Sequence, residues 1–183
     1  MIERHFLDDT LLQLRKLKKT TEAAMAQIDD DAFFAVLGQD ENSIALIIKH
    51  VAGNMRSRWT DFLTSDGEKP DRNRDTEFEL AAQETRARIM ALWEDGWRRV
   101  FGAIEPLGPG DLMKTVKIRG ESHTVLEAIQ RQVTHYAGHS GQIVLLAKHY
   151  AGDGWVSLSI PRGKSKEFDV AKSGAPYGLK GTR

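Results

Sequence analysis

Residues 124–150 carry the clearest helical pattern in the sequence, and they commit the chain to a helical fold. Apolar side chains recur along this stretch at helical spacing, and Thr124-x-x-Glu127 is a capping box that marks its start. His135 and His139 lie within it. Because they are four residues apart, they share one face of the predicted helix, about 40° apart around its axis. Their ring nitrogens can therefore converge on one point, as the ligands of a divalent metal ion do.

The histidine pair alone does not distinguish a metal site from two unrelated surface histidines, since six histidines in 183 residues produce such spacings by chance. Gly138 and Gly141 flank His139. Each glycine lowers helix stability by about 1 kcal/mol relative to alanine, so the two indicate that another helix or a ligand passes close by. Tyr136 stands where a zinc protease carries its glutamate, which disfavours protease chemistry.

Composition limits the classes of protein that remain. The chain has 183 residues, of which 40% are hydrophobic, so we expect one domain with a substantial core and a tail. The 26 basic and 26 acidic residues cancel, which argues against a nucleic-acid partner. Apolar runs are too short to span a bilayer, and the first residues lack a signal-peptide pattern, so we expect a cytoplasmic protein without a membrane partner. The absence of cysteine excludes thiolate ligands and a cysteine nucleophile.

The remaining chain supplies three more helices and a short extended piece. Amphipathic spacing predicts helices over 2–28, over 43–64 after an N-cap at Asn42, and over 76–104 after the capping box Thr76-x-x-Glu79. Residues 112–122 alternate and turn at Gly120, which is typical of an extended segment or hairpin. The fold class is therefore all-α: an antiparallel four-helix bundle with a short hairpin segment before the last helix.

The predicted second helix carries a polar stripe beside its apolar face. His50, Asn54 and Arg58 follow one another at intervals of one turn. A lone histidine there is usually hydrogen-bonded and partly buried, whereas a stripe of His, Asn and Arg is typical of the wall of a polar pocket.

The C-terminal residues lack helical periodicity. We expect a bundle domain over 1–151 and an extended tail over 152–183, in which residues 152–168 are held by Trp155 and Ile160 against the bundle or a sister subunit. An apolar tail without its own core, together with the glycines of the last helix, leads us to expect a homodimer.

Three segments together resemble the DinB/YfiT-like metalloenzyme superfamily, in a branch largely of unknown function. They are IIKHVAGN at 47–54, VKIRGESHTV at 116–125 and HYAGHSGQI at 135–143. The likeness covers about residues 5–150. The resemblance implies that His50, His135 and His139 are the metal ligands, with zinc or nickel preferred and iron as a further candidate. Relatives in this superfamily include thiol-dependent S-transferases and a maleylpyruvate isomerase that uses mycothiol.

A site of three neutral imidazoles keeps the full charge of its ion, and would acidify a bound water or small thiol. Because the chain has no cysteine, a sulfur nucleophile would arrive as a cosubstrate. Asn54 and Arg58 are candidates for holding its carboxylate or hydroxyls, and Tyr136 is a candidate for supporting or packing against the site. The leading hypothesis is a thiol S-transferase acting on small molecules. A metal-dependent hydrolase, a non-catalytic metal-binding stress-response bundle acting through a protein partner, and a helical dimer with structural histidines remain alternatives.

Overall fold

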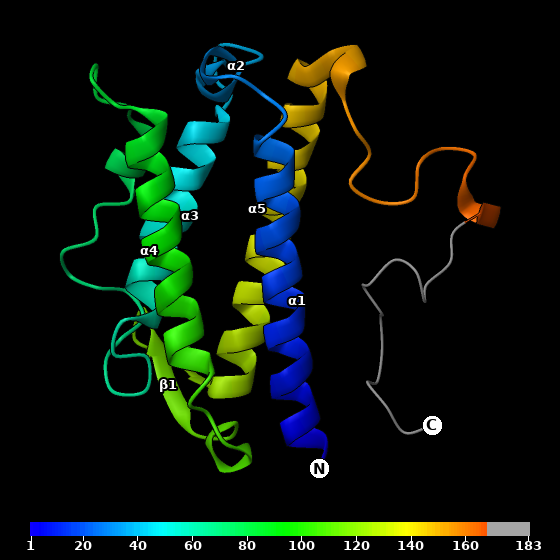
Figure 1. Cartoon of the computed structure of the whole chain (residues 1–183). Helices are drawn as coiled ribbons and strands as arrows, with labels where there is room; N and C mark the ends of the chain where they lie inside the picture. Colours follow the sequence, from blue (N-terminus) through cyan, green and yellow to red (C-terminus); the bar gives the residue numbers. More distant parts are fainter. Residues whose placement is uncertain (168–183) are drawn as a thin grey trace.

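Four long helices pack side by side in the computed structural model, which describes residues 1–167 (Figure 1). They are α1 (Ile2–Met25), α3 (Ile44–Trp59), α4 (Arg86–Ile104) and α5 (Val125–Ala151). A short helix α2 (Asp30–Phe34) caps one end of the bundle, and the hairpin of β1 (Thr115–Ile118) and β2 (Glu121–Thr124) lies at the other. The predicted helical bundle and the predicted hairpin before the last helix are confirmed.

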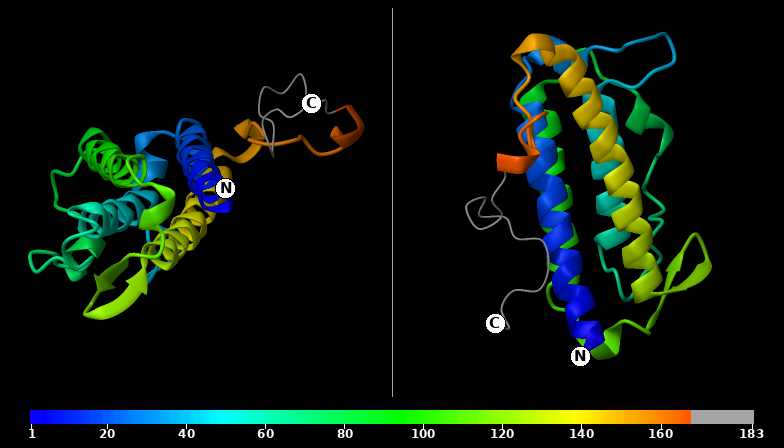
Figure 2. Two further views of the ribbon diagram at one scale, coloured as in Figure 1. Left: turned by 90° about the horizontal axis from the view of Figure 1, so that it is seen from below. Right: turned by 90° about the vertical axis from the view of Figure 1, so that its right-hand side faces the viewer.

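The directions of the helices are set by a long segment, residues 60–85, that returns along the bundle after α3 (Figure 1). Consequently α4 begins near the end of α1, where the Arg86 guanidinium contacts the Met25 carbonyl at 2.5 Å. It then runs parallel to α3, while α1 and α5 run antiparallel to both (Figures 1 and 2). The bundle therefore differs from a wholly antiparallel one in two packed pairs, α3–α4 and α1–α5, each of which is parallel. This crossing segment contains a 3-10 turn, η1 (Asp75–Phe78), packed on α3.

Two predicted helix starts were wrong, and both corrections follow from observed caps. Helix α3 is capped by Ser43, whose hydroxyl accepts the Leu46 N–H at 3.2 Å, and it ends at Trp59. Helix α4 begins ten residues after the predicted start, with Thr85 as its N-cap. Thr76 does not cap a helix, since its hydroxyl donates to the Asn73 carbonyl at 3.0 Å. Helix α1 is also shorter than predicted, because it ends at Met25.

The hairpin is closed by a two-residue turn. Arg119 and Gly120 both have positive φ, 57° and 77°, as a type I′ turn requires. Its tip is fixed to the 60–85 segment, because the Asp66 carboxylate accepts both turn N–H groups at 2.8 and 2.7 Å.

The glycines that allow close helix packing are not the two that the sequence indicated. Gly96 of α4 faces α3, and a Cβ there would lie 2.9 Å from the Met55 sulfur. Gly138 and Gly141 are exposed on α5, and a Cβ at either would have no neighbour within 4 Å among the described residues. The expectation that another element of this chain passes close to them was wrong.

The start of the tail is attached to the bundle on the side of α1 (Figure 2). Trp155 packs on the hydrophobic core, and the backbone of Val156 exchanges two hydrogen bonds with the Gln27 side chain, at 2.7 and 3.1 Å. Ile160 is 38% exposed and is not among the side chains that pack on the core, and its contact with a sister subunit stays a prediction. Residues 168–183 of the predicted tail lie outside the described part, and the homodimer stays a prediction. No helix within residues 1–167 is long and apolar enough to cross a membrane.

One buried polar chain links α3 to α5. The Trp59 indole N–H donates to the Tyr136 hydroxyl at 2.8 Å, and that hydroxyl donates to the Asn54 amide oxygen at 3.1 Å. Tyr136 is only 2% exposed. Burial is the main reason that the pKa of Tyr136 is raised, so its hydroxyl stays protonated and can make both contacts.

We expect Tyr136→Phe to lower the free energy of unfolding by about 1–3 kcal/mol, because it leaves the buried Trp59 donor without a partner. Tyr150→Phe is the matched control, since the buried Tyr150 hydroxyl has no hydrogen-bond partner within residues 1–167. Urea unfolding of both variants measures the difference. Equal stability of the two variants would contradict a structural role for the polar chain.

Candidate metal centre

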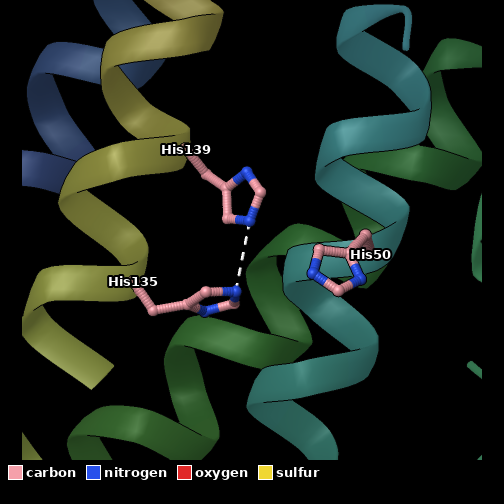
Figure 3. Close-up of side chains that lie close together, drawn as sticks. All are labelled: His50, His135 and His139. Atoms are coloured by element: carbon pink, nitrogen blue, oxygen red, sulfur yellow. Dashed lines mark hydrogen bonds between the residues drawn. The ribbon is translucent and has the colours of Figure 1, made fainter. Parts of the chain in front are cut away.

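The three histidines that the sequence indicated lie together in the middle of the bundle. His50 projects from α3, and His135 and His139 project from successive turns of α5 toward it (Figure 3). One ligand nitrogen from each residue lies within 4.8 Å of the other two. The ring centre of His50 is 5.5 Å from that of His135 and 5.1 Å from that of His139. The group can therefore hold one metal ion, whereas His5 and His149 lie outside it.

The donor set fits a small divalent ion. Bonds of about 2.0–2.1 Å from imidazole to metal place neighbouring ligand nitrogens roughly 3–3.4 Å apart. The Nε2 atoms of His135 and His139 are 3.1 Å apart, which matches that spacing. The other separations, up to 4.8 Å, are longer than this spacing, so a bound ion would require the imidazoles to move closer together. In addition, His135 Nδ1 is buried with no hydrogen-bond partner in residues 1–167, so the contact with His139 is the hydrogen bond that holds this imidazole.

Outer hydrogen bonds hold two of the rings in place. His50 Nδ1 lies 2.9 Å from the Glu77 carboxylate, and His139 Nδ1 lies 2.8 Å from the Gln142 amide oxygen. When Nδ1 is engaged in this way, the ring presents Nε2 to the ion, and a carboxylate partner increases the basicity of the ligand.

Glu77 is the site residue that sequence reasoning missed. It is 7% exposed, and the Arg72 guanidinium donates a hydrogen bond to each of its two carboxylate oxygens, at 2.8 and 2.9 Å. The carboxylate rests directly on α3 at Gly53, where a Cβ would overlap it. The sequence prediction placed Glu77 near the start of a long helix. One feature of the sequence could have indicated a close contact here. Gly53 lies one helical turn from His50, and a glycine inside a helix often marks a place where another group approaches the backbone.

Burial keeps the α5 histidines neutral. Burial, reinforced by the neighbouring His139 and His50, lowers the pKa of His135 to about 4. Burial also lowers the pKa of His139. Burial opposes ionisation of Glu77, but hydrogen bonds from His50 and Arg72 outweigh it and lower the pKa of this carboxyl. At neutral pH the two α5 imidazoles therefore offer free electron pairs, and the group behind His50 is a carboxylate.

A polar pocket of about 400 Å³ opens beside the histidines, and His50 and His135 form part of its wall. Asn54 and Arg58, predicted to bind substrate, also line it. Arg58 is partly engaged, because its guanidinium donates to the Gly67 carbonyl and pairs with Glu68. Tyr136 is not among the lining residues, and it reaches the pocket only through its hydrogen bond to Asn54. The site therefore combines candidate metal ligands with space for a small molecule.

The chain belongs to a family described as "Protein of unknown function (DUF1572)", whose model matches residues 1–164. The match covers the whole bundle and the start of the tail, and its description assigns no activity. No curated protein and no solved structure matches the chain. The resemblance to the DinB/YfiT-like superfamily stays a prediction, supported by the three-histidine group.

We expect His50→Ala and His139→Ala each to lower zinc affinity by at least about 100-fold, since loss of a ligand costs more than loss of an outer partner. His5→Ala and His149→Ala should retain full affinity. Calorimetric zinc titration measures all four variants, and circular dichroism should show an intact bundle because the core is apolar. Retention of tight binding by His50→Ala would exclude a shared three-histidine site.

We expect Glu77→Gln to lower zinc affinity by about 10- to 100-fold, because the amide cannot supply the negative charge behind His50. Gly53→Ala should have a similar effect, since the added methyl group displaces the carboxylate. Glu79→Gln, in the same segment but exposed, is the matched control. Equal zinc affinity for Glu77→Gln and Glu79→Gln would show that the buried carboxylate has no influence on the ligands.

Proposed function

We propose that this protein is a divalent-metal-dependent enzyme acting on small molecules, and in the first place a thiol S-transferase. The observation that carries the proposal is a group of three convergent imidazoles, two of which line a pocket of about 400 Å³. Histidines with a purely structural role require no such space, whereas an enzyme requires room for its substrate.

The ligands would be His50, His135 and His139, and their chemistry narrows the choice of ion. Neutral imidazoles suit zinc, nickel and ferrous iron, while magnesium and calcium prefer oxygen ligands. We propose zinc or nickel first and iron second. When bound, such an ion supplies Lewis-acid chemistry that lowers the pKa of a thiol or water. The chain itself contributes neutral donors, the carboxylate behind His50 and a polar wall that orients the reactants.

The composition of the pocket wall favours a thiol over water as the nucleophile. Because the chain contains no cysteine, such a thiol would be a low-molecular-weight cosubstrate. No Asp or Glu belongs to the residues that line the pocket, and the nearby Glu77 is occupied by His50 and Arg72. A bound ion would acidify water as well as a thiol, but the pocket wall offers no carboxylate to assist the attack of water. A thiol ionises near pH 8.5 on its own and needs less help.

The alternatives are ranked by the same observations. A metal-dependent hydrolase comes second, because the pocket wall lacks a carboxylate that would assist a metal-bound water. A non-catalytic metal-binding bundle with a stress-response role comes third, because the pocket beside the ligands then has no purpose. The resemblance to thiol-dependent proteins of the DinB/YfiT-like superfamily supports the placement of a thiol S-transferase first.

We expect zinc- or nickel-loaded protein to accelerate the reaction of at least one low-molecular-weight thiol with monochlorobimane, within a panel of cysteine, glutathione and coenzyme A. The rate should rise with pH between about 6 and 8, because the thiolate is the reactive form. Fluorescence of the conjugate measures the rate, with metal-stripped protein and His135→Ala as controls. If no thiol is consumed faster than in these controls, thiol transfer is excluded and hydrolysis or metal binding alone takes its place.

A further inference from the structure

The pocket beside the candidate metal ligands is lined by an unusual concentration of arginine. Five of its ten lining residues are arginines, and none is acidic. These arginines come from four parts of the chain: Arg58 from α3, Arg72 and Arg74 from the 60–85 segment, Arg119 from the hairpin turn, and Arg131 from α5. Since net charge over the whole chain is zero, this concentration is local.

The carboxylates around the pocket do not balance these charges. Glu68 pairs with Arg58 at 2.9 Å and Arg119 at 3.0 Å, and Glu77 pairs with Arg72 at 2.8 Å. Asp66, which is close by, is directed to the backbone N–H groups of the hairpin turn instead. Five guanidinium groups therefore share two paired carboxylates.

Arg74 and Arg131 make no ion pair within residues 1–167. The Arg74 guanidinium lies 5.8 Å from the centre of the Phe78 ring, and Arg131 is exposed. Both residues line the pocket, so they present unpaired positive charge to whatever occupies it.

Two buried polar atoms in the wall lack partners. Arg58 Nε and the Gln132 amide oxygen have no hydrogen bond within residues 1–167, and their residues are 5% and 3% exposed. Burial, reinforced by the charges of Arg72 and Arg119, also lowers the pKa of Arg58. The Gln132 oxygen is an acceptor and Arg58 Nε is closed off from the pocket space, so neither atom points to an anion by itself. A bound anion would, however, relieve the mutual repulsion of the arginines.

The order of residues along the helices places the arginines at a fixed distance from the histidines. On α3, Asn54 and Arg58 lie one and two turns beyond His50. On α5, which runs in the opposite direction, Arg131 lies one turn before His135. Both helices therefore lead from the metal centre toward the hairpin, and Arg131 is displaced from His135 by about 6 Å along the helix axis. One small molecule can span both groups.

We propose that this pocket selects a small molecule carrying at least two negative charges as carboxylates or phosphate, with Arg74, Arg119 and Arg131 as the residues that determine specificity. The inference rests on the proposed function, since it names the class of substrate for the same site. The anionic groups bind toward the hairpin, and the reacting end of the molecule extends to His50 and His135. Bidentate contacts from guanidinium groups suit both carboxylate and phosphate.

The test is calorimetric binding at low salt to the metal-loaded full chain. The probes are tricarballylate, which carries three carboxylates, glycerol 3-phosphate, and uncharged glycerol. We expect at least one anion to bind while glycerol does not, with affinity that falls as salt rises. Preference for tricarballylate identifies a polycarboxylate substrate, and preference for glycerol 3-phosphate identifies a phosphorylated one.

Substitutions locate the binding. Arg131→Ala and Arg74→Ala should each weaken anion binding by about tenfold, and Arg131→Lys should lose less. Arg4→Ala, which removes an exposed arginine of α1, should leave the affinity within about twofold. These substitutions break no ion pair within residues 1–167, so the variants should fold. Absence of binding by either anion, or equal affinity of Arg131→Ala and Arg4→Ala, would overturn the proposal.

Failure of this inference is distinguishable from failure of the proposed function. If anions bind but no thiol is consumed, the pocket is an anion site and thiol transfer is excluded. If a thiol is consumed but no anion binds, the enzyme proposal stands and the specificity proposal falls. Zinc titration of Arg131→Ala provides a further check, since its metal affinity should equal that of the unmodified chain.

Discussion

The buried contact of Glu77 with His50 and Arg72 holds the functional side of the bundle together. The 60–85 segment crosses from one end of the bundle to the other without a long helix of its own, so it depends on polar contacts for its position. Glu77 attaches the middle of that segment to α3. Through the same carboxylate it orients a candidate metal ligand and fixes an arginine of the pocket wall. Burying a charge is costly unless it is paired, and here both oxygens are paired.

This contact also explains why the helices were easier to predict than the segment between them. Long helices are recognised by their apolar spacing, and α5 was predicted within one residue at both ends, with a genuine capping box at its start. Thr76-x-x-Glu79 has the same local pattern, yet Glu77 is drawn onto α3 by partners distant in sequence. Capping patterns depend only on neighbouring residues and cannot account for such a tertiary contact. The start of α4 was therefore predicted ten residues too early.

The candidate site shows the same division between local and distant information. Helix geometry alone brings His135 and His139 together, whereas the position of His50 required a resemblance to known proteins. The arginine pocket was only partly foreseen, through Arg58. Its other arginines come from a loop, a hairpin turn and α5, and nothing in their spacing relates them before the chain folds. The two parts of the site differ in chemistry. The neutral histidines can bind a metal ion, and the positively charged arginines can attract an anion.

The overlap between a side chain at position 53 and the Glu77 carboxylate has an evolutionary consequence. Neither residue can change freely on its own. A larger residue in place of Gly53 would expel the carboxylate, and a chain without an acidic residue at 77 would have no reason to keep a glycine in the middle of α3, where it weakens the helix. Among members of the family, positions 53 and 77 should therefore vary together. A glycine at 53 with an acidic residue at 77 would mark the relatives in which a carboxylate contacts His50.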